Sequence, residues 1–462
     1  MDTKYNNEWK NKKVAFLTLG CKVNSYETEA MQKLFEEEGL SVVDFSDRAD
    51  IYVINTCTVT NIADRKSRQM LHKAKKMNES ALVVAVGCYV QASKEVLEQD
   101  TAVDVVVGNN KKKDIIGILK EHLYGNTTKE LRDEMNVALI SEELEYEELN
   151  IEAVSEKTRA YIKIQDGCNQ FCSYCIIPYA RGRIRSRAKD SVLAEVKRLV
   201  EKGYKEIVLT GIHLSSYGLE KAVTGQENNT TRAESPLLNL IIDLNKIEGL
   251  KRIRLGSLEP RIITEHFAKT LSEMEKFCPH FHLSLQSGCD ETLKRMNRRY
   301  NTMEYYEKCV LLRKYFHNPA ITTDIIVGFP GETEEEFEQT KEFLKKVSFA
   351  QMHIFKYSKR QGTKAAAMDS QIKEEIKALR SSILISLGDE LTKAYQESFI
   401  GKIEKVLIEE SLIIDDVNYQ IGHNEKYQKL AIKEEKDLTN SIITVKVKEH
   451  LSKEIMFCEI MD

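Results

Sequence analysis

Short apolar runs alternate with helix-length stretches along most of this chain, and this alternation restricts the fold more than any other feature. In the first part, nearly continuous Val, Ile and Leu predict strands buried on both faces, as in a parallel sheet covered by helices. The intervening stretch Ser25–Gly39 has the length of a helix. We therefore expect an α/β fold that begins with a doubly wound parallel sheet over residues 12–140, with strands at Val14–Cys21, Ile51–Cys57, Ala81–Cys88 and Val103–Asn110.

A second series of strand candidates lies within residues 154–384. Six apolar runs with helix-length spacers predict an open (β/α)6 barrel, a partial form of the eight-unit TIM barrel, with its chemistry at the carboxyl ends of the strands. The runs are YIKIQDG, EIVLTGIH, RIRLGSLEP, FHLSLQSG, ITTDIIVGFPG and AQMHIFKYS. We expect the acidic stretch from Ser141 to be a solvated connector and the polar stretch Gly218–Ser235 to be a surface loop.

The spacing of apolar residues changes in the last part of the chain. Apolar residues recur every three or four positions from Ile376 to Leu391, which predicts an amphipathic helix. Beyond it, Ile443, Val445 and Val447 alternate with polar residues, and further short runs are typical of strands. We expect a small antiparallel β-barrel over residues 387–462.

Composition excludes several classes of protein. The formal charge of −4 and the pI of about 6.3 give no sign of a generally basic nucleic-acid binder, so any RNA contact must come from a local patch. No apolar run is long enough to span a bilayer, and the polar first residues contain no secretory segment. Ten cysteines are too few for a disulfide scaffold of this size. We expect a cytoplasmic protein without a membrane partner.

Three cysteines, Cys168, Cys172 and Cys175, directly follow the first strand candidate of the barrel. Thiolates in this number suit zinc or an iron-sulfur cluster. A closed zinc site requires a fourth protein ligand, and none is obvious nearby. A cubane with one iron free of protein ligands is the main interpretation, and a zinc loop with a distant fourth ligand is the alternative.

Three other cysteines, Cys21, Cys57 and Cys88, each end a different strand of the first sheet. Parallel strands place their carboxyl ends at one edge, where such sheets form their ligand crevice, so these thiols are expected to converge on one cluster. The alternative is three buried cysteines that act as small apolar residues. The remaining cysteines are expected to be structural; they are Cys278, Cys289, Cys309 and Cys458.

These motifs resemble a known family. The CxxxCxxC pattern after the first barrel strand resembles the radical S-adenosylmethionine (SAM) enzymes. The stretches LGCKVNSYETE, NTCTVT and VGCYVQ resemble the amino-terminal domain of the methylthiotransferases, and IGHNEKYQKLAI loosely resembles their RNA-binding TRAM barrel. The resemblance implies two 4Fe-4S clusters, one at each set of three cysteines, with SAM bound to the free iron at the Cys168 set.

The resemblance also implies where SAM lies. The EIVLTG strand occupies the place where the family binds the amino group of SAM, HLSLQSG the ribose region, and TDIIVGFPGE the adenine region. The positions carried over are Thr210, Gly211, Ser284, Gln286, Asp324, Ile326 and Gly328.

The implied reaction uses two SAM molecules, one as methyl donor and one as radical source. LTGIHLSSYG and CIIPYARGRIRSR resemble the branch that adds a methylthio group to C2 of N6-threonylcarbamoyladenosine at position 37 of tRNA. The implied partners are this tRNA, a sulfur donor, and a reductase or flavodoxin-type electron donor. Isopentenyladenosine in tRNA, or an aspartate of a ribosomal protein, is the alternative substrate, and a zinc-stabilised RNA-binding protein is the non-enzymatic alternative.

A row of alternating arginines follows the loop of Cys168, Cys172 and Cys175, at Arg181, Arg183, Arg185 and Arg187. Because guanidinium groups pair well with phosphates, we predict that this row binds RNA beside the cluster. His213 is a candidate for substrate contact. Lysines of the last barrel could extend the RNA track or simply be solvated; they are Lys402, Lys405, Lys426, Lys429, Lys446 and Lys448.

Overall fold

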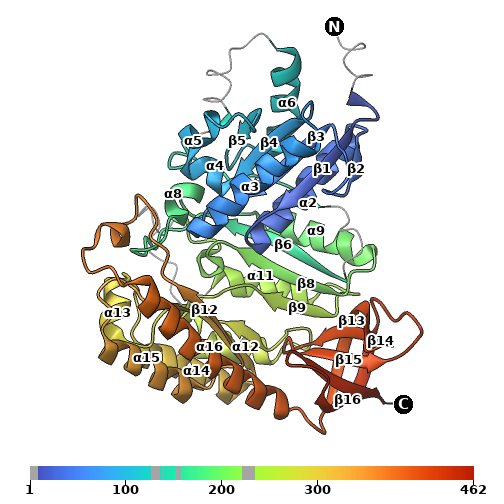
Figure 1. Cartoon of the computed structure of the whole chain (residues 1–462). Helices are drawn as coiled ribbons and strands as arrows, with labels where there is room; N and C mark the ends of the chain where they lie inside the picture. Colours follow the sequence, from blue (N-terminus) through green and yellow to red (C-terminus); the bar gives the residue numbers. More distant parts are fainter. Residues whose placement is uncertain (1–8, 126–135, 138, 152–157, 221–234, 462) are drawn as a thin grey trace.

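A computed structural model describes residues 9–125, 136–137, 139–151, 158–220 and 235–461. The first sheet lies above an open barrel, and a small closed barrel lies beside the lower end of the open one (Figure 1). The first sheet is wholly parallel with the order β2-β1-β3-β4-β5. Its strands are β1 (Lys13–Thr18), β2 (Ser41–Val43), β3 (Ile51–Thr56), β4 (Leu82–Gly87) and β5 (Val105–Val107).

Helices cover both faces of this sheet, as the doubly wound prediction requires. In β3, Tyr52 and Ile54 enter one apolar cluster, while Ile51 and Val53 enter the cluster on the opposite face. The strand β2 was not predicted, because its three residues are too few to show a period. The helical elements are α2 (Lys22–Glu37), α3 (Asn61–Met77), α4 (Cys88–Ala92), α5 (Lys94–Glu98), η1 (Lys112–Asp114) and α6 (Ile115–Tyr124).

The central part contains all six predicted strands and is open on one side. It consists of the sheets β7-β6-β8-β9 and β10-β11-β12, which meet through parallel bridges such as Leu258 to Leu283. The strands β6 and β12 are not paired, so the barrel is open between them. The strands are β6 (Arg159–Asp166), β7 (Arg185–Ser186), β8 (Glu206–Gly211), β9 (Arg252–Leu255), β10 (His280–His282), β11 (Ala320–Val327) and β12 (Gln351–Lys356).

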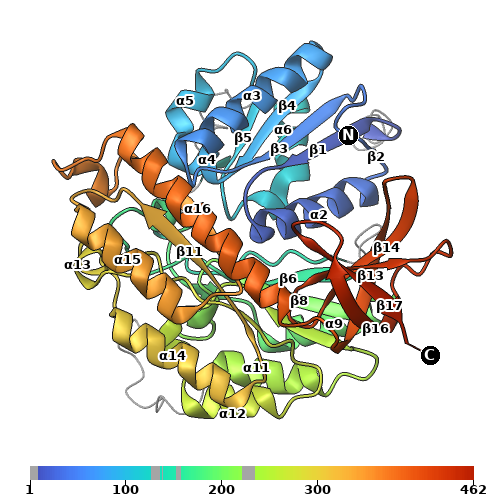
Figure 2. The ribbon, with the colours of Figure 1, turned by 60° about the horizontal axis from the view of Figure 1, so that its bottom comes forward.

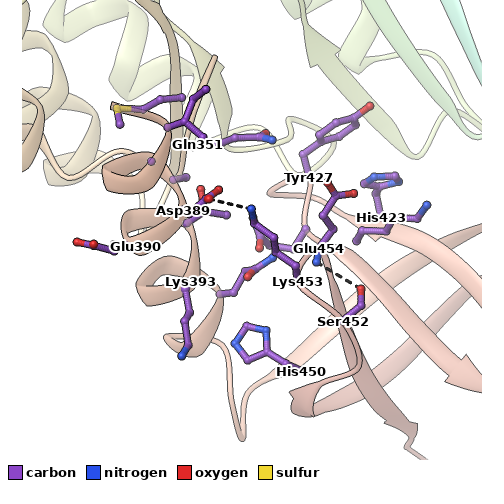
Figure 3. Close-up of a pocket in the computed structure, with 18 residues that line it drawn as sticks. Gln351, Asp389, Glu390, Lys393, His423, Tyr427, His450, Ser452, Lys453 and Glu454 are labelled. Carbon is purple, nitrogen blue, oxygen red and sulfur yellow. Dashed lines mark hydrogen bonds and ion pairs between the residues drawn. The ribbon is translucent and has the colours of Figure 1, made fainter. Parts of the chain in front are cut away.

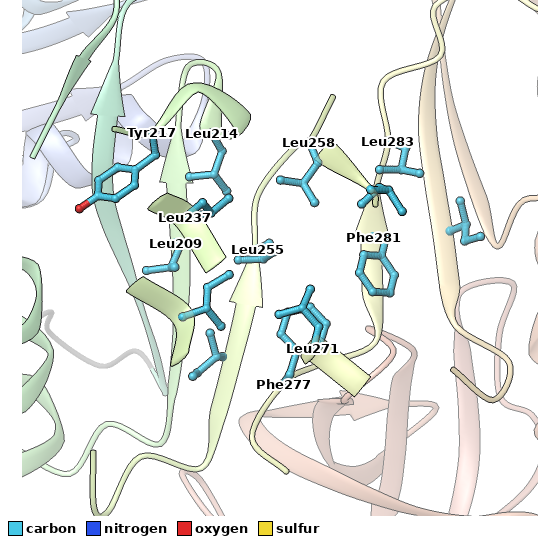
Figure 4. Close-up of a cluster of buried hydrophobic side chains, with 14 of the residues drawn as sticks. Leu209, Leu214, Tyr217, Leu237, Leu255, Leu258, Leu271, Phe277, Phe281 and Leu283 are labelled. Atoms are coloured by element: carbon cyan, nitrogen blue, oxygen red, sulfur yellow. The ribbon is translucent and has the colours of Figure 1, made fainter. Parts of the chain in front are cut away.

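Alternation along these strands separates the core from the interior of the barrel. Leu209, Leu255 and Phe281 pack outward against the surrounding helices in one apolar cluster (Figure 4). Their neighbours along each strand therefore face inward. The helical elements of this part are α8 (Ile177–Arg181), α9 (Lys189–Glu201), η2 (Leu214–Ser216), α11 (Pro236–Asn245), η3 (Pro260–Ile262), α12 (Glu265–Ser272), α13 (Asp290–Arg295), α14 (Thr302–Tyr315), α15 (Glu334–Val347) and η4 (Lys364–Ala367).

The predicted amphipathic helix is α16 (Glu374–Glu397), which packs along the open barrel and leads to the closed one (Figure 2). It continues through the boundary predicted between residues 384 and 387. The closed barrel has the strand order β13-β14-β15-β17-β16, which confirms the predicted small barrel. Its strands pair antiparallel except β15 and β17, which pair in parallel. Its strands are β13 (Ile403–Ile414), β14 (Val417–Asn424), β15 (Lys429–Lys433), β16 (Ile442–His450) and β17 (Ile455–Ile460).

The acidic stretch from Ser141 is not simply a solvated connector, and that prediction is wrong in part. Glu147, Leu149 and Ile151 are buried between the first sheet and the barrel. Glu147 accepts a hydrogen bond from the backbone of Lys113 at 3.0 Å, and the carbonyl of Leu149 accepts one from the Tyr26 hydroxyl. These contacts offset the cost of burying polar groups. Most of the predicted loop Gly218–Ser235 lies outside the described residues.

Among the described residues, none of the helices combines the length and apolar composition that crossing a bilayer requires.

Candidate metal centres

The first cysteine set converges at the carboxyl edge of the first sheet, as predicted. Cys21 follows β1, Cys57 follows β3 and Cys88 follows β4, and these three strands are neighbours in the sheet. Burial, together with the nearby Cys88 and Cys21, raises the pKa of the Cys57 thiol to about 11. The three thiols are therefore close enough to act on one another.

A glycine makes this convergence possible. Gly20 has a φ of +102°, and a Cβ built on it would lie 2.8 Å from the Sγ of Cys57. Only a residue without a side chain fits both the left-handed backbone and this close approach. The residue before Cys21 therefore controls how near Cys21 and Cys57 lie.

The second cysteine set lies on the single loop after β6. Cys168, Cys172 and Cys175 are each partly buried, and burial raises the pKa of Cys168 to about 11 and of Cys175 to about 12. Gly167 opens this loop with a φ of +71°, and a Cβ there would lie 1.8 Å from the carbonyl oxygen of Arg183. Because thiols are protonated at neutral pH in such surroundings, metal binding must displace those protons.

Each set has one arginine that donates to a sulfur. The Nη1 of Arg298 lies 3.2 Å from the Sγ of Cys172, and its guanidinium packs over the Tyr300 ring at 4.8 Å. The Nε of Arg181 lies 3.2 Å from the Sγ of Cys88. A hydrogen bond from a cation stabilises thiolate character on the accepting sulfur. Sequence reasoning missed Arg298, which is far from the cysteine loop along the chain.

Arg181 is fully buried in an ion network that joins the first sheet to the barrel. Its Nη1 lies 2.7 Å from Glu27 and 3.1 Å from Asp166, and both carboxylates also pair with Lys163. Glu27 further pairs with Lys112 at 3.0 Å. Burial alone would raise the pKa of Glu27, but Arg181, Lys112 and Lys163 hold it well below its usual range. The network fixes the two cysteine sites relative to each other.

The predicted RNA row is therefore wrong for three of its four arginines. Arg181, Arg185 and Arg187 are 0%, 1% and 1% exposed. Arg185 donates to the carbonyl of Arg181 at 2.9 Å, and Arg187 pairs with the buried Glu195. The reason is that α8, which ends at Arg181, and β7, which contains Arg185, place these side chains against buried acceptors. Arg183 is exposed and packs over the Phe171 ring at 4.8 Å, so RNA contact by Arg183 stays a prediction.

The residues predicted to bind SAM surround the same end of the barrel. Ser284, Gln286, Asp324 and Ile326 are partly exposed, whereas the residues between them along the strands are buried. Gln286 has a φ of +73° and its backbone N–H donates to the Asp324 carbonyl at 2.9 Å, which joins the end of β10 to β11. Binding of SAM by Thr210, Gly211, Ser284, Gln286, Asp324, Ile326 and Gly328 stays a prediction.

Sequence reasoning also missed a polar cluster inside the barrel. His282, Asp324 and His353, from β10, β11 and β12, have ligand atoms that all lie within 4.8 Å of one another. The period of two in the barrel strands places them on one face, but sequence alone does not reveal how three strands align. Near the cysteine loop, burial lowers the pKa of His213 to about 4, so this candidate substrate contact is a neutral imidazole at pH 7.

The groove in Figure 3 lies between α16 and the closed barrel, at the amino ends of the open-barrel strands and so opposite the cysteines. Tyr427 inserts there, with the guanidinium groups of Arg159 and Arg254 at 5.0 and 4.8 Å from its ring. Three of the predicted RNA-track lysines pair with carboxylates of the closed barrel, namely Lys426, Lys429 and Lys448.

Three thiols in each set fit a cluster better than a closed zinc site, which requires four protein ligands. Four ligands around one zinc lie about 3.8 Å apart, given Zn–S bonds of about 2.3 Å. In the described part of the chain, the polar cluster of His282, Asp324 and His353 is the one group of three whose ligand atoms all lie within 4.8 Å. Among the described residues, neither cysteine set is such a close group, and three thiolates that bind three different irons of a cubane do not need to be one. Both donor sets therefore suit an iron-sulfur cluster.

Comparisons with known proteins agree with this chemistry. Residues 162–344 match the radical SAM superfamily, and residues 13–108 match an uncharacterized protein family designated UPF0004. A threonylcarbamoyladenosine tRNA methylthiotransferase of Bacillus subtilis is 41% identical over 94% of this chain and 93% of its own, and one of Aquifex aeolicus is 40% identical over 90% and 98%. A tRNA-2-methylthio-N(6)-dimethylallyladenosine synthase of Clostridium botulinum is 32% identical over 93% of each chain.

A solved structure supports the fold alone. The radical SAM methyltransferase TsrM of Kitasatospora setae aligns with a TM-score of 0.55 at 15% identity, over 74% of this chain and 73% of that one. Radical SAM enzymes use SAM together with a 4Fe-4S cluster, for which the CxxxCxxC loop is the matching site. Because the relatives above span nearly the whole chain at more than 30% identity, this protein belongs to the radical SAM methylthiotransferase family.

Proposed function

We propose that this protein adds a methylthio group to C2 of N6-threonylcarbamoyladenosine at position 37 of tRNA. Two sets of three cysteines on the two sides of one interface carry the proposal. Relatives with this substrate in their names are 41% and 40% identical to the chain, against 32% for the dimethylallyladenosine relative. The two sets suit two 4Fe-4S clusters, each with one position free of protein ligands.

When bound, the cluster at Cys168, Cys172 and Cys175 supplies the electron that cleaves SAM, and the cluster at Cys21, Cys57 and Cys88 carries the sulfur to be transferred. The chain's own residues position these groups. Arg298 and Arg181 each hold one cysteine sulfur by a hydrogen bond of 3.2 Å. The interface network around Glu27 keeps the sites in a fixed relation, and the first sheet covers the open side of the barrel and limits the access of water.

The RNA surface proposed here is α3 together with Arg183. Arg65, Arg68, Gln69, His72, Lys73 and Lys76 line a shallow pocket on the exposed face of this helix. The helix begins just after Cys57, so its basic face extends outward from the first cysteine set. The exposed cations Arg65, Lys73 and Lys76 suit RNA phosphates. Replacing three of the arginines and lysines of this helix face with Gln should weaken tRNA binding and reduce its salt dependence.

The test is transfer to defined substrates by the anaerobically reconstituted protein. We expect nucleoside mass spectrometry to show a methylthio addition on an anticodon stem-loop RNA that carries threonylcarbamoyladenosine. The same RNA with isopentenyladenosine and a ribosomal-protein peptide are the controls. A methylthio mass shift on either control alone would end this assignment.

The proposal includes a sulfur donor and a reductase or flavodoxin-type electron donor, because the reaction consumes one sulfur and requires electrons from outside the chain. A cytoplasmic location fits these partners and a tRNA substrate, since a reducing compartment preserves thiolate ligands.

A further inference from the structure

A lysine next to the first cysteine set along the chain has no ion-pair partner among the described residues. Lys22 directly follows Cys21 and is the first residue of α2, which packs against β6 and β8 of the open barrel. Its ammonium nitrogen lies 5.7 Å from the centre of the Tyr161 ring on β6. Tyr161 alternates with the outward-facing Ile162 and so belongs to the barrel interior. Lys22 therefore extends from the cluster edge into the barrel.

The other interface cations have carboxylate partners. Lys112 and Lys163 pair with Glu27, and Arg187 pairs with Glu195. Three arginines also pair with carboxylates, namely Arg181, Arg159 and Arg254. For Lys22, the structure gives no hydrogen bond or ion pair of its ammonium group within the described residues, and the charges of Arg159, Arg254 and Glu206 act on it only from a distance. A positive charge is thus available beside the inner face of the barrel, where an anionic ligand would meet it.

The polar cluster of the barrel lies within electrostatic range of this lysine. The charge of Lys22 acts on His353 and on His280, whose strands are β12 and β10. On the same inner face, the Nε2 of His282 lies 3.2 Å from a carboxylate oxygen of Asp324. These residues therefore offer one cation without an ion-pair partner among the described residues, together with hydrogen-bonding groups that suit a ligand with both a carboxylate and neutral polar groups.

We propose that Lys22 binds the carboxylate of the threonylcarbamoyl group and so selects this modified adenosine over adenosines whose N6 substituent is uncharged. The inference rests on the proposed function and names the residue that reads its substrate. The threonylcarbamoyl group carries one carboxylate, a hydroxyl and a urea, whereas an isopentenyl group is a hydrocarbon. A lysine next to the first cysteine set is well placed, because C2 and the N6 substituent lie on the same side of the adenine ring, separated by N1.

The test compares two RNAs against matched variants of the full chain. Binding of an anticodon stem-loop with threonylcarbamoyladenosine, and of the same RNA with its carboxylate converted to a methyl ester, is measured by fluorescence anisotropy. For the wild type we expect the ester to bind about 10- to 100-fold more weakly, the usual range for a hydrogen bond to a charged group. Lys22→Met should bring this ratio close to one, and Lys22→Arg should restore most of it.

The control is Lys345→Met, which removes an equally long cation from the outer helix α15, where Lys345 pairs with Glu342. It should keep the wild-type ratio. The inference is overturned if Lys22→Met also keeps that ratio, or if the wild type does not distinguish the ester from the acid. A failure of the proposed function is seen separately, as absence of methylthio transfer to threonylcarbamoyladenosine by the wild-type protein.

Discussion

The two cysteine sites have similar donor sets but are built in opposite ways. Cys168, Cys172 and Cys175 lie on one loop, so local sequence alone brings them together. Cys21 and Cys57, with Cys88, come from the ends of three strands and meet only when the whole first sheet has formed. The loop site can be recognised from a local sequence motif, whereas the sheet site can be predicted only from the topology of parallel strands.

The arginines differ in the same way. Arg298 contacts Cys172 and Tyr300 within the barrel, and the structure shows no carboxylate paired with it among the described residues. Arg181 belongs to the barrel but donates to Cys88 of the first sheet, and it pairs with one carboxylate from each side of the interface, Glu27 and Asp166. The sheet site therefore depends on docking of the barrel, while the loop site depends on the barrel alone.

Loss of one loop ligand should have the largest effect. We expect Cys172→Ala to abolish SAM cleavage, because a cubane held by two cysteines loses its iron or its geometry. The measurement is deoxyadenosine formed from SAM under reducing conditions. Normal deoxyadenosine production by this variant would show that the loop site does not hold the cluster that cleaves SAM.

Loss of one sheet ligand should separate the two activities. We expect Cys57→Ala to leave deoxyadenosine production largely intact and to block methylthio transfer to tRNA. Both products are measured in the same reaction. If this variant still methylthiolates tRNA at the wild-type rate, the sheet site is not part of the reaction.

The interface arginine should matter more for stability than the barrel arginine. We expect Arg181→Met to reduce the free energy of unfolding by roughly 3–5 kcal/mol, because it leaves buried Glu27 and Asp166 short of a cation. Arg298→Met should cost clearly less, since no paired carboxylate is left behind. Urea unfolding of both variants checks this, and equal losses would contradict the difference between the sites.

A buried network at the amino ends of the open-barrel strands gives a reference for acid sensitivity. Burial alone would raise the pKa of Glu206, but Arg254, Arg159 and Arg252 lower it to about 2. Because this folded-state pKa lies below the ordinary value near 4.3, the contribution is complete above that pH and is lost as pH falls toward 2. Glu206→Gln should remove about 3 kcal/mol of pH-dependent stability, measured by unfolding between pH 5.5 and about 2.5. An unchanged pH profile would refute the pairing.

The smallest change tests the close approach at the sheet site. We expect Gly20→Ala to destabilise the chain by about 1–2 kcal/mol through its left-handed backbone, and in addition to displace Cys57 and lower iron content. Gly362→Ala is the control, because Gly362 has a φ of +83° but open space around its Cβ position. It should show the backbone cost alone. If both variants retain full iron, the contact between residue 20 and Cys57 is unimportant.

The sequence predicts what depends on local period and order along the chain. Six barrel strands, four strands of the first sheet and both cysteine sets follow from apolar runs and their ends. Contacts that form only when the first sheet docks on the barrel cannot be predicted in this way. The row from Arg181 to Arg187 has the pattern of a solvated or RNA-binding track, and only the fold shows that Glu27, Asp166 and Glu195 lie opposite it.

Short or polar elements were also beyond prediction. The strand β14 was missed because its residues, including Asn418, Gln420 and Gly422, lack a run of apolar side chains, although backbone pairing with β13 and β15 fixes it. The contact of Arg298 with Cys172 and the cluster of His282, Asp324 and His353 depend on register between strands and loops. Neither leaves a local signal in the sequence.

The central claim is that this chain holds two separate cubanes, one on a loop and one on a sheet edge. Iron content of anaerobically reconstituted protein tests it most directly, with the wild type beside two triple alanine variants, one for each cysteine set. The account predicts about eight irons per chain in the wild type and about four in each variant. About four irons in the wild type, or a triple variant that keeps the wild-type content, would contradict it.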